Sequence, residues 1–137
     1  MHHKPLILCA DDSLKFLDGW KMLLELNGYD VLTASDGTEA FQEFVSHPVD
    51  LVLLDYHMPH MNGDVAAAHM KSCKTDVPIA LFSSNDVANL GDLETVDTFI
   101  SKSEPLPKVL EIVDHLLDAR FLFRRLDPSG AEGARTR

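Results

Sequence analysis

Five short apolar runs, separated by segments with a helical period, constrain the fold of this chain more than any other feature. The runs are Leu6–Ala10, Tyr29–Ala34, Leu51–Leu54, Pro78–Phe82 and Thr98–Ser101. Between them, apolar residues recur at spacings of three and four, which is typical of helices. Apolar strands that alternate with helices predict right-handed β-α-β units and a parallel sheet covered by helices on both faces.

The helical segments can be placed from the same spacing and from their end signals. We expect helices over residues 13–27, from Asp36 to the residue before Pro48, over 63–73 and around 109–117. The second of these is expected to bury Ala40, Phe41, Phe44 and Val45. Residues 85–97, between the fourth and fifth strands, include Gly91 and four acidic residues. A fourth helix in that segment is therefore predicted to be short or irregular.

Length and charge limit the classes of protein to consider. The chain has 137 residues and a formal charge of −10, and we expect one domain over 1–125 with a flexible tail over 126–137. An acidic surface repels phosphates, which disfavours nucleic-acid binding. No apolar run approaches the roughly 20 residues that a membrane span needs, and no signal peptide is evident. The sequence thus predicts a cytoplasmic protein, a monomer or weak dimer, without nucleic-acid or membrane partners.

Several other side chains have structural interpretations. The aromatic residues with core spacing are Phe16, Trp20, Phe41 and Phe44. Cys9 and Cys73 lie in apolar segments, and both are expected to be buried. The basic residues near the end of the last helix, which we expect to be solvated, are Arg120, Arg124 and Arg125.

Polar residues follow four of the five predicted strands. They are Asp11 and Asp12 after the first, Asp55 after the third, Ser83 after the fourth and Lys102 after the fifth. Asp11 and Asp12 could instead cap the first helix, and Asp55 could simply begin a turn. Ser83 could cap the following segment, and Lys102 could be solvated. Because the carboxyl ends of parallel strands meet at one edge of a sheet, we expect these side chains to share one cleft.

Such a cleft suggests a specific chemistry. Three carboxylates close together repel one another unless a cation is present. A hard dication such as Mg²⁺ (or Mn²⁺) suits oxygen ligands and keeps open positions for phosphate oxygens. Asp55 could then attack a phosphoryl group and form an acyl phosphate, with Ser83 and Lys102 stabilising the phosphoryl oxygens.

The strand-end residues, with Leu51–Pro59 and Asn62-Gly63, resemble the receiver domain of two-component response regulators over residues 4–122. The resemblance implies an α/β, flavodoxin-like, doubly wound five-stranded parallel sheet of order 2-1-3-4-5. It also implies that Asp55 takes a phosphoryl group from a phosphohistidine. The donor would be a histidine kinase or a histidine phosphotransfer protein.

The resemblance also assigns roles to individual residues. Asp12 and Asp55 would bind Mg²⁺ with the backbone carbonyl of His57, and Asp11 would act through water. Ser83 and Phe99 would change position on phosphorylation and so alter a surface that binds an unidentified downstream protein. By its position, His57 would influence hydrolysis of the acyl phosphate, and we expect its side chain to point outward. Asn85, two residues after Ser83, would have the same influence.

One position departs from the family pattern. Family members usually have a proline after the lysine, joined by a cis bond, whereas Ser103 follows Lys102 here. A cis bond without proline costs about 3–4 kcal/mol. We therefore predict either a trans bond with a shifted loop or a strained bond.

Three other functions are compatible with parts of the pattern. A haloacid-dehalogenase-like phosphatase needs a second aspartate two residues after its nucleophile, where His57 stands. A flavin-binding protein of the same fold needs a phosphate cradle after the first strand, where Asp11 and Asp12 would repel phosphate. A phosphorylation-independent, receiver-like interaction module is the remaining alternative, suggested by Ser103 and the weak fourth helix. We expect a stand-alone phosphoacceptor that assists its own phosphorylation and dephosphorylation, and not a dedicated enzyme.

Overall fold

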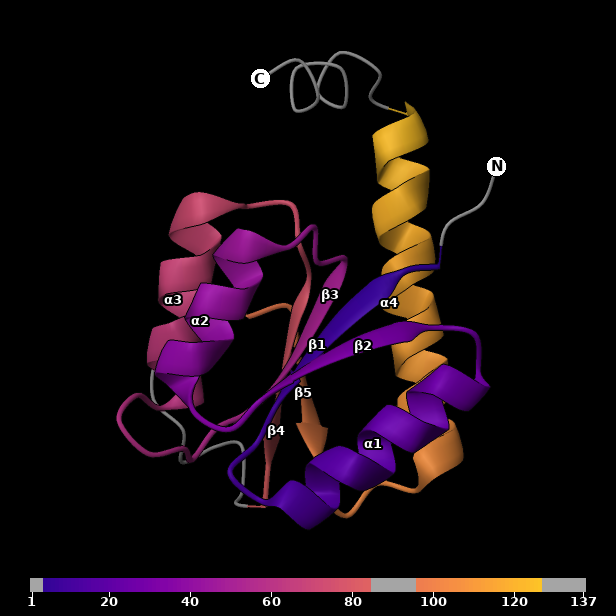
Figure 1. Cartoon of the computed structure of the whole chain (residues 1–137). Helices are drawn as coiled ribbons and strands as arrows, with labels where there is room; N and C mark the ends of the chain where they lie inside the picture. Colours follow the sequence, from indigo (N-terminus) through magenta and orange to yellow (C-terminus); the bar gives the residue numbers. More distant parts are fainter. Residues whose placement is uncertain (1–3, 85–95, 127–137) are drawn as a thin grey trace.

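The structure, a computed structural model, describes residues 4–84 and 96–126, and the side chains of these ranges up to residue 122. It contains a five-stranded sheet made of β1 (Leu6–Ala10), β2 (Asp30–Ala34), β3 (Leu51–Asp55), β4 (Ile79–Ser83) and β5 (Thr98–Ser101). All neighbouring strands are parallel, and their order is β2-β1-β3-β4-β5 (Figure 1). The predicted sheet and strand order are confirmed.

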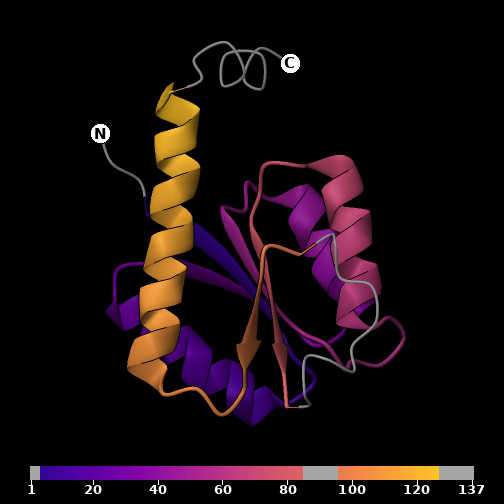
Figure 2. The same cartoon turned by 180° about the vertical axis from the view of Figure 1, so that it is seen from behind.

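Helices cover both faces of the sheet. They are α1 (Leu14–Leu26), α2 (Gly37–Ser46), α3 (Gly63–Cys73) and α4 (Leu106–Leu126). The pair α2 and α3 lies on one face, and α1 and α4 lie on the other (Figures 1 and 2). Helix α4 extends beyond the predicted 109–117, and the expected domain boundary after residue 125 falls in its last turn. Most of the segment 85–97, where a fourth helix was predicted, lies outside the described residues.

Each face of the sheet has its own apolar core. In β1, Leu8 packs into the core beneath α2 and α3, whereas Ile7 and Cys9 pack into the core beneath α1 and α4. Successive strand residues point to opposite faces, so a strand covered on both sides is apolar except at its end. All five residues of β3 and of β4 are accordingly buried. None of the helices in the described part of the chain is long and apolar enough to span a membrane.

Two burial predictions are wrong. Val45 has an exposed fraction of 47%, because a one-residue step along a helix turns about 100° away from the buried Phe44. Cys73, the last residue of α3, is exposed. Of the aromatic residues expected in the core, Trp20 and Phe44 are buried, and Phe16 and Phe41 are only partly buried.

Arg120 is not solvated as expected. Its side chain has an exposed fraction of 8%, and its Nε lies 3.5 Å from Asp50 Oδ1. Its Nη1 donates a hydrogen bond of 2.7 Å to the carbonyl oxygen of Asp76 and lies 3.1 Å from Asp76 Oδ2. A buried guanidinium requires such partners. Arg120 therefore ties α4 to the edge of the sheet opposite the strand ends that carry Asp11 and Asp55.

Candidate functional site

Three carboxylates meet at the carboxyl edge of the sheet. Asp11 and Asp12 directly follow β1, and Asp55 is the last residue of the neighbouring strand β3. One carboxylate oxygen from each of the three lies within 4.8 Å of the other two. Asp11 and Asp55 are buried, with exposed fractions of 2% and 5%, whereas Asp12 is exposed. The predicted cluster therefore exists, and it is open to solvent at Asp12.

The start of α1 leaves Asp11 and Asp12 available to this cluster. Ser13 is the N-cap of α1, and its hydroxyl accepts a hydrogen bond of 3.3 Å from the Phe16 N–H. The alternative in which the two aspartates cap this helix is therefore wrong. Asp11 Oδ1 accepts the Ser13 N–H at 2.8 Å, which fixes the orientation of the Asp11 carboxylate.

Lys102 supplies positive charge to the cluster. Its Nζ lies 2.9 Å from Asp11 Oδ2 and 3.1 Å from Asp55 Oδ1. The ammonium also lies 4.7 Å from the centroid of the Phe16 ring. None of the peptide bonds within residues 4–84 and 96–126 is cis, so the Lys102–Ser103 bond is trans. The lysine reaches both carboxylates without a following proline.

The charges of the cluster are unbalanced. Burial raises the pKa of Asp55, and the nearby charge of Asp11 raises it further, against the opposing effect of the Lys102 hydrogen bond. For Lys102, burial acts to lower the pKa, but the bonds to Asp11 and Asp55 outweigh it and the net pKa is raised. Two of the three carboxylates, those of Asp11 and Asp55, share the Lys102 ammonium. This donor set of clustered, partly exposed carboxylate oxygens fits a hard dication.

The other predicted site residues lie outside the carboxylate cluster, and only some of them are close to it. Ser83 ends β4, is buried, and its register partner is Ser101 of β5, so it lies at the same edge as Asp55. Phe99 of β5 is partly buried against the core beneath α2 and α3. His57 is exposed, and its ring packs edge-on against Tyr56 with 4.7 Å between centroids. Asn85 lies outside the described residues.

Gly63 has a role that the sequence analysis missed. Its N–H donates a hydrogen bond of 2.7 Å to the Tyr56 carbonyl. A Cβ at Gly63 would lie only 2.4 Å from the backbone oxygen of Asp55. The first turn of α3 thus packs directly against the end of β3. A glycine at the predicted start of a helix was the available signal, but the contact itself depends on the fold.

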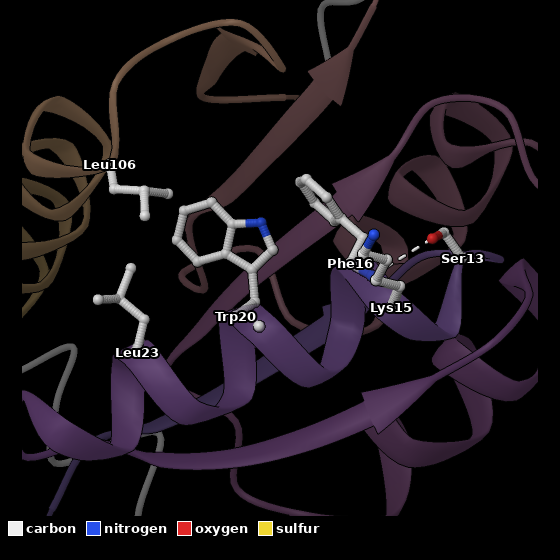
Figure 3. Close-up of a pocket in the computed structure, with 7 residues that line it drawn as sticks. Ser13, Lys15, Phe16, Trp20, Leu23 and Leu106 are labelled. Atoms are coloured by element: carbon white, nitrogen blue, oxygen red, sulfur yellow. Dashed lines mark hydrogen bonds between the residues drawn. The ribbon is translucent and has the colours of Figure 1, made fainter.

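A groove of about 350 Å³ lies beside the cluster. It is lined by Ser13, Lys15, Phe16, Gly19, Trp20, Leu23 and Leu106. Figure 3 shows Trp20 and Leu23 of α1 facing Leu106 at the start of α4. The Phe16 ring packs edge-on against Trp20, with 5.8 Å between centroids, and also contacts the Lys102 ammonium. Phe16 therefore links the apolar groove to the charged cluster.

The chain is similar to known protein sequences over most of its length. Residues 7–114 match the family model of the response regulator receiver domain. The chain is 30% identical over 128 residues to response regulator MprA of Mycolicibacterium vanbaalenii, covering 93% of this chain and 54% of that protein. It is 29% identical over 119 residues to transcriptional regulatory protein PrrA of Mycobacterium bovis, covering 85% and 51%. The chain spans about half the length of these curated relatives.

Solved structures support the same fold. Response regulator protein TrrA of Thermotoga maritima, in complex with Mg²⁺ and BeF, has a TM-score of 0.77 and 30% identity, with coverage of 82% of this chain and 98% of that one. The signal receiver domain of an HD domain-containing protein of Pseudomonas fluorescens has a TM-score of 0.84 at 23% identity, with coverage of 91% and 95%. The second match shows the fold alone.

Proposed function

The chain belongs to the response regulator receiver domain family, and we propose that Asp55 is its phosphoacceptor. Membership makes the chain a receiver module of two-component signal transduction. One observation carries the choice of Asp55: it is a buried strand-end carboxylate that faces both the Lys102 ammonium, at 3.1 Å, and the other two carboxylates. Asp11 and Asp12 are suited to binding a cation beside Asp55.

The proposed reaction is a phosphoryl transfer to Asp55. The donor is a phosphohistidine on a histidine kinase or a histidine phosphotransfer protein. A carboxylate oxygen of Asp55 forms a bond to phosphorus as the phosphorus–nitrogen bond breaks, and the histidine nitrogen keeps the electron pair. The Lys102 ammonium and the Ser83 hydroxyl hold the phosphoryl oxygens. Such transfers need little beyond alignment and charge neutralisation, and the same groups would assist later hydrolysis.

The carboxylate cluster is proposed to hold Mg²⁺ (or Mn²⁺). The direct ligands would be side-chain oxygens of Asp12 and Asp55 and the backbone carbonyl of His57. Asp11 would bind the ion through a water molecule. When bound, the ion supplies positive charge that neutralises phosphoryl oxygens. The excess of carboxylates over ammonium groups supports this proposal, as does the similar TrrA structure, which is a complex with Mg²⁺ and BeF.

Ser83 and Phe99 are proposed to carry the signal from the site. Ser83 pairs in register with Ser101, two residues after Phe99 on β5. A shift of Ser83 toward a phosphoryl oxygen would therefore act on the strand that holds Phe99, and so on the surface offered to a downstream protein. His57, exposed next to the acceptor, and Asn85 are proposed to modulate hydrolysis.

Acetyl phosphate tests the phosphoacceptor directly. We expect the protein with Mg²⁺ and acetyl phosphate to gain the mass of one phosphoryl group. Borohydride reduction converts an aspartyl phosphate to homoserine, so peptide mass analysis should find homoserine at position 55. A label on another residue would contradict the choice of Asp55. No label at all would favour the phosphorylation-independent interaction module.

Mg²⁺ is expected to raise the melting temperature of the wild-type protein. The reason is that the ion binds the carboxylate cluster of the folded state, which the unfolded chain lacks. Asp12→Ala should remove most of this gain, and because Asp12 is exposed, the core should remain intact. Thermal unfolding followed by circular dichroism, with and without Mg²⁺ at equal ionic strength, provides the measurement. Asp18→Ala, an exposed position on α1, is the control that should keep the gain; an unchanged gain in Asp12→Ala would place the ion elsewhere.

A further inference from the structure

A tight turn over residues 101–104 directs Lys102 from β5 to the carboxylates. The Lys102 N–H donates a hydrogen bond of 3.0 Å to the Ser83 carbonyl, which ties its backbone to β4. The Glu104 N–H donates a hydrogen bond of 3.0 Å to the Ser101 carbonyl. This i to i+3 bond makes Lys102 and Ser103 the central residues of a β-turn. The direction in which the lysine side chain leaves the backbone is therefore set by this turn.

The Ser101 hydroxyl makes two further contacts within the same turn. Its hydroxyl oxygen accepts a hydrogen bond of 3.1 Å from the Ser103 N–H and lies 2.7 Å from the Ser103 hydroxyl oxygen. Serine hydroxyls stabilise turns by such bonds to backbone N–H groups two residues ahead. A proline at position 103 has no N–H to donate. The bond from the Ser103 N–H to the Ser101 hydroxyl is therefore possible because residue 103 is not a proline.

We propose that Ser101 is a positioning residue for Lys102, holding the turn in the one arrangement that places the ammonium on Asp55. The proposal rests on the phosphoacceptor role of Asp55. Lysine is a compact charge on a flexible four-carbon stem, so its position depends on its backbone. The Lys102 ammonium is shared between Asp11 at 2.9 Å and Asp55 at 3.1 Å. In a looser turn it could stay with Asp11 and leave the acceptor.

Removing the Ser101 hydroxyl should slow phosphorylation without dismantling the site. We expect Ser101→Ala to lower the initial rate of phosphoryl incorporation from acetyl phosphate, at saturating Mg²⁺, by about tenfold. This is less than the roughly hundredfold loss that a 1 Å misplacement of a catalytic group can cause. Ser101→Thr keeps the hydroxyl and should restore the rate. The Mg²⁺-induced gain in melting temperature should persist in Ser101→Ala, because the three carboxylates are unchanged.

Ser72→Ala is the matched control. The Ser72 hydroxyl also donates a hydrogen bond of 2.7 Å, to the His69 carbonyl, but it lies in the last turn of α3, whereas Lys102 follows β5. Its removal should leave the rate of incorporation unchanged. The same measurement on both serine variants therefore separates the loss of any hydrogen-bonded serine hydroxyl from the loss of the Ser101 hydroxyl.

A double-mutant cycle tests whether Ser101 acts through Lys102. Lys102→Met should slow incorporation about a hundredfold, the usual effect of removing a group that stabilises developing charge. Adding Ser101→Ala to Lys102→Met should then have no further effect, because coupled residues are not additive. A further slowing by the same factor, or equal rates for wild type and Ser101→Ala, would overturn the positioning role. A wild-type protein that takes no phosphoryl group would instead overturn the proposed function, and this role with it.

Discussion

Asp55→Asn is expected to abolish phosphoryl incorporation and, in the absence of metal, to stabilise the fold. Asparagine keeps the size of the side chain, but its amide oxygen is too weak a nucleophile to accept the phosphoryl group. Mass analysis after treatment with acetyl phosphate and Mg²⁺ should show no gain. The stabilisation follows from the raised pKa of Asp55, which burial and the charge of Asp11 cause.

The sign of this stability effect follows from proton binding. The folded state binds a proton at Asp55 more tightly than the unfolded chain does, so the contribution of Asp55 to the stability of the wild type falls as the pH rises from the ordinary pKa of Asp55 through its raised pKa. Asp55→Asn has no such charge to bury. The difference in the free energy of unfolding between variant and wild type should therefore grow across this window and then level off. Urea unfolding with EDTA at several pH values measures it.

Asp36→Asn is the matched control for the phosphoacceptor. Asp36 follows β2 at the same edge of the sheet but is the N-cap of α2, where it accepts the Glu39 N–H at 2.7 Å. Asparagine caps helices about as well as aspartate, so this variant should incorporate phosphoryl groups normally. Incorporation that survives in Asp55→Asn would contradict the proposal. A less stable Asp55→Asn would mean that the pairing with Lys102 outweighs the repulsion from Asp11.

Gly63→Ala should have the largest effect on stability, a loss of about 2–3 kcal/mol in the free energy of unfolding, as is usual for overpacked sites. The new Cβ would lie 2.4 Å from the Asp55 backbone oxygen and 2.9 Å from Leu81 Cδ2. The Asp55 oxygen belongs to a central strand and cannot yield without disturbing the sheet. Because the shift occurs at the acceptor itself, phosphoryl incorporation should fall as well. Urea unfolding and acetyl phosphate labelling measure the two effects.

Gly19→Ala makes the same chemical change where there is room. A Cβ at Gly19, within α1, would meet nothing within 4 Å. Alanine is favoured over glycine inside a helix by about 1 kcal/mol, so this variant should be more stable than the wild type. A Gly63→Ala protein as stable as the wild type would show that α3 can move away from β3 without cost.

The carboxyl-edge cluster could be predicted because it depends on two simple properties. Apolar runs locate strands, and parallel strands bring their carboxyl ends to one edge, so Asp11 and Asp55 had to be neighbours once β1 and β3 were. The order of the strands in the sheet could not be predicted in this way, because periodicity alone does not determine it. It came from the resemblance of the strand-end motifs to a known family, and the structure confirms it.

The contacts that the sequence did not reveal join residues through loops or across layers. Arg120 looked like one of several basic residues at a helix end, but its partners Asp50 and Asp76 lie in distant parts of the chain and follow no periodic pattern. The Ser101–Ser103 bond depends on a turn whose shape the sequence did not specify. Such bonds depend on individual distances, whereas hydrophobic periodicity reports only which face of an element is buried.

One of the two cysteines is buried and the other is exposed, so the two differ in reactivity. Burial, and then the charge of Asp11, raise the pKa of Cys9 to about 12, while Cys73 is exposed at the end of α3. Thiolates are the reactive form, so a maleimide dye should attach to Cys73 and spare Cys9. Helix α3 begins at Gly63, against the Asp55 carbonyl. The unaltered chain thus offers one attachment point for an optical reporter, on the helix whose opposite end touches the acceptor.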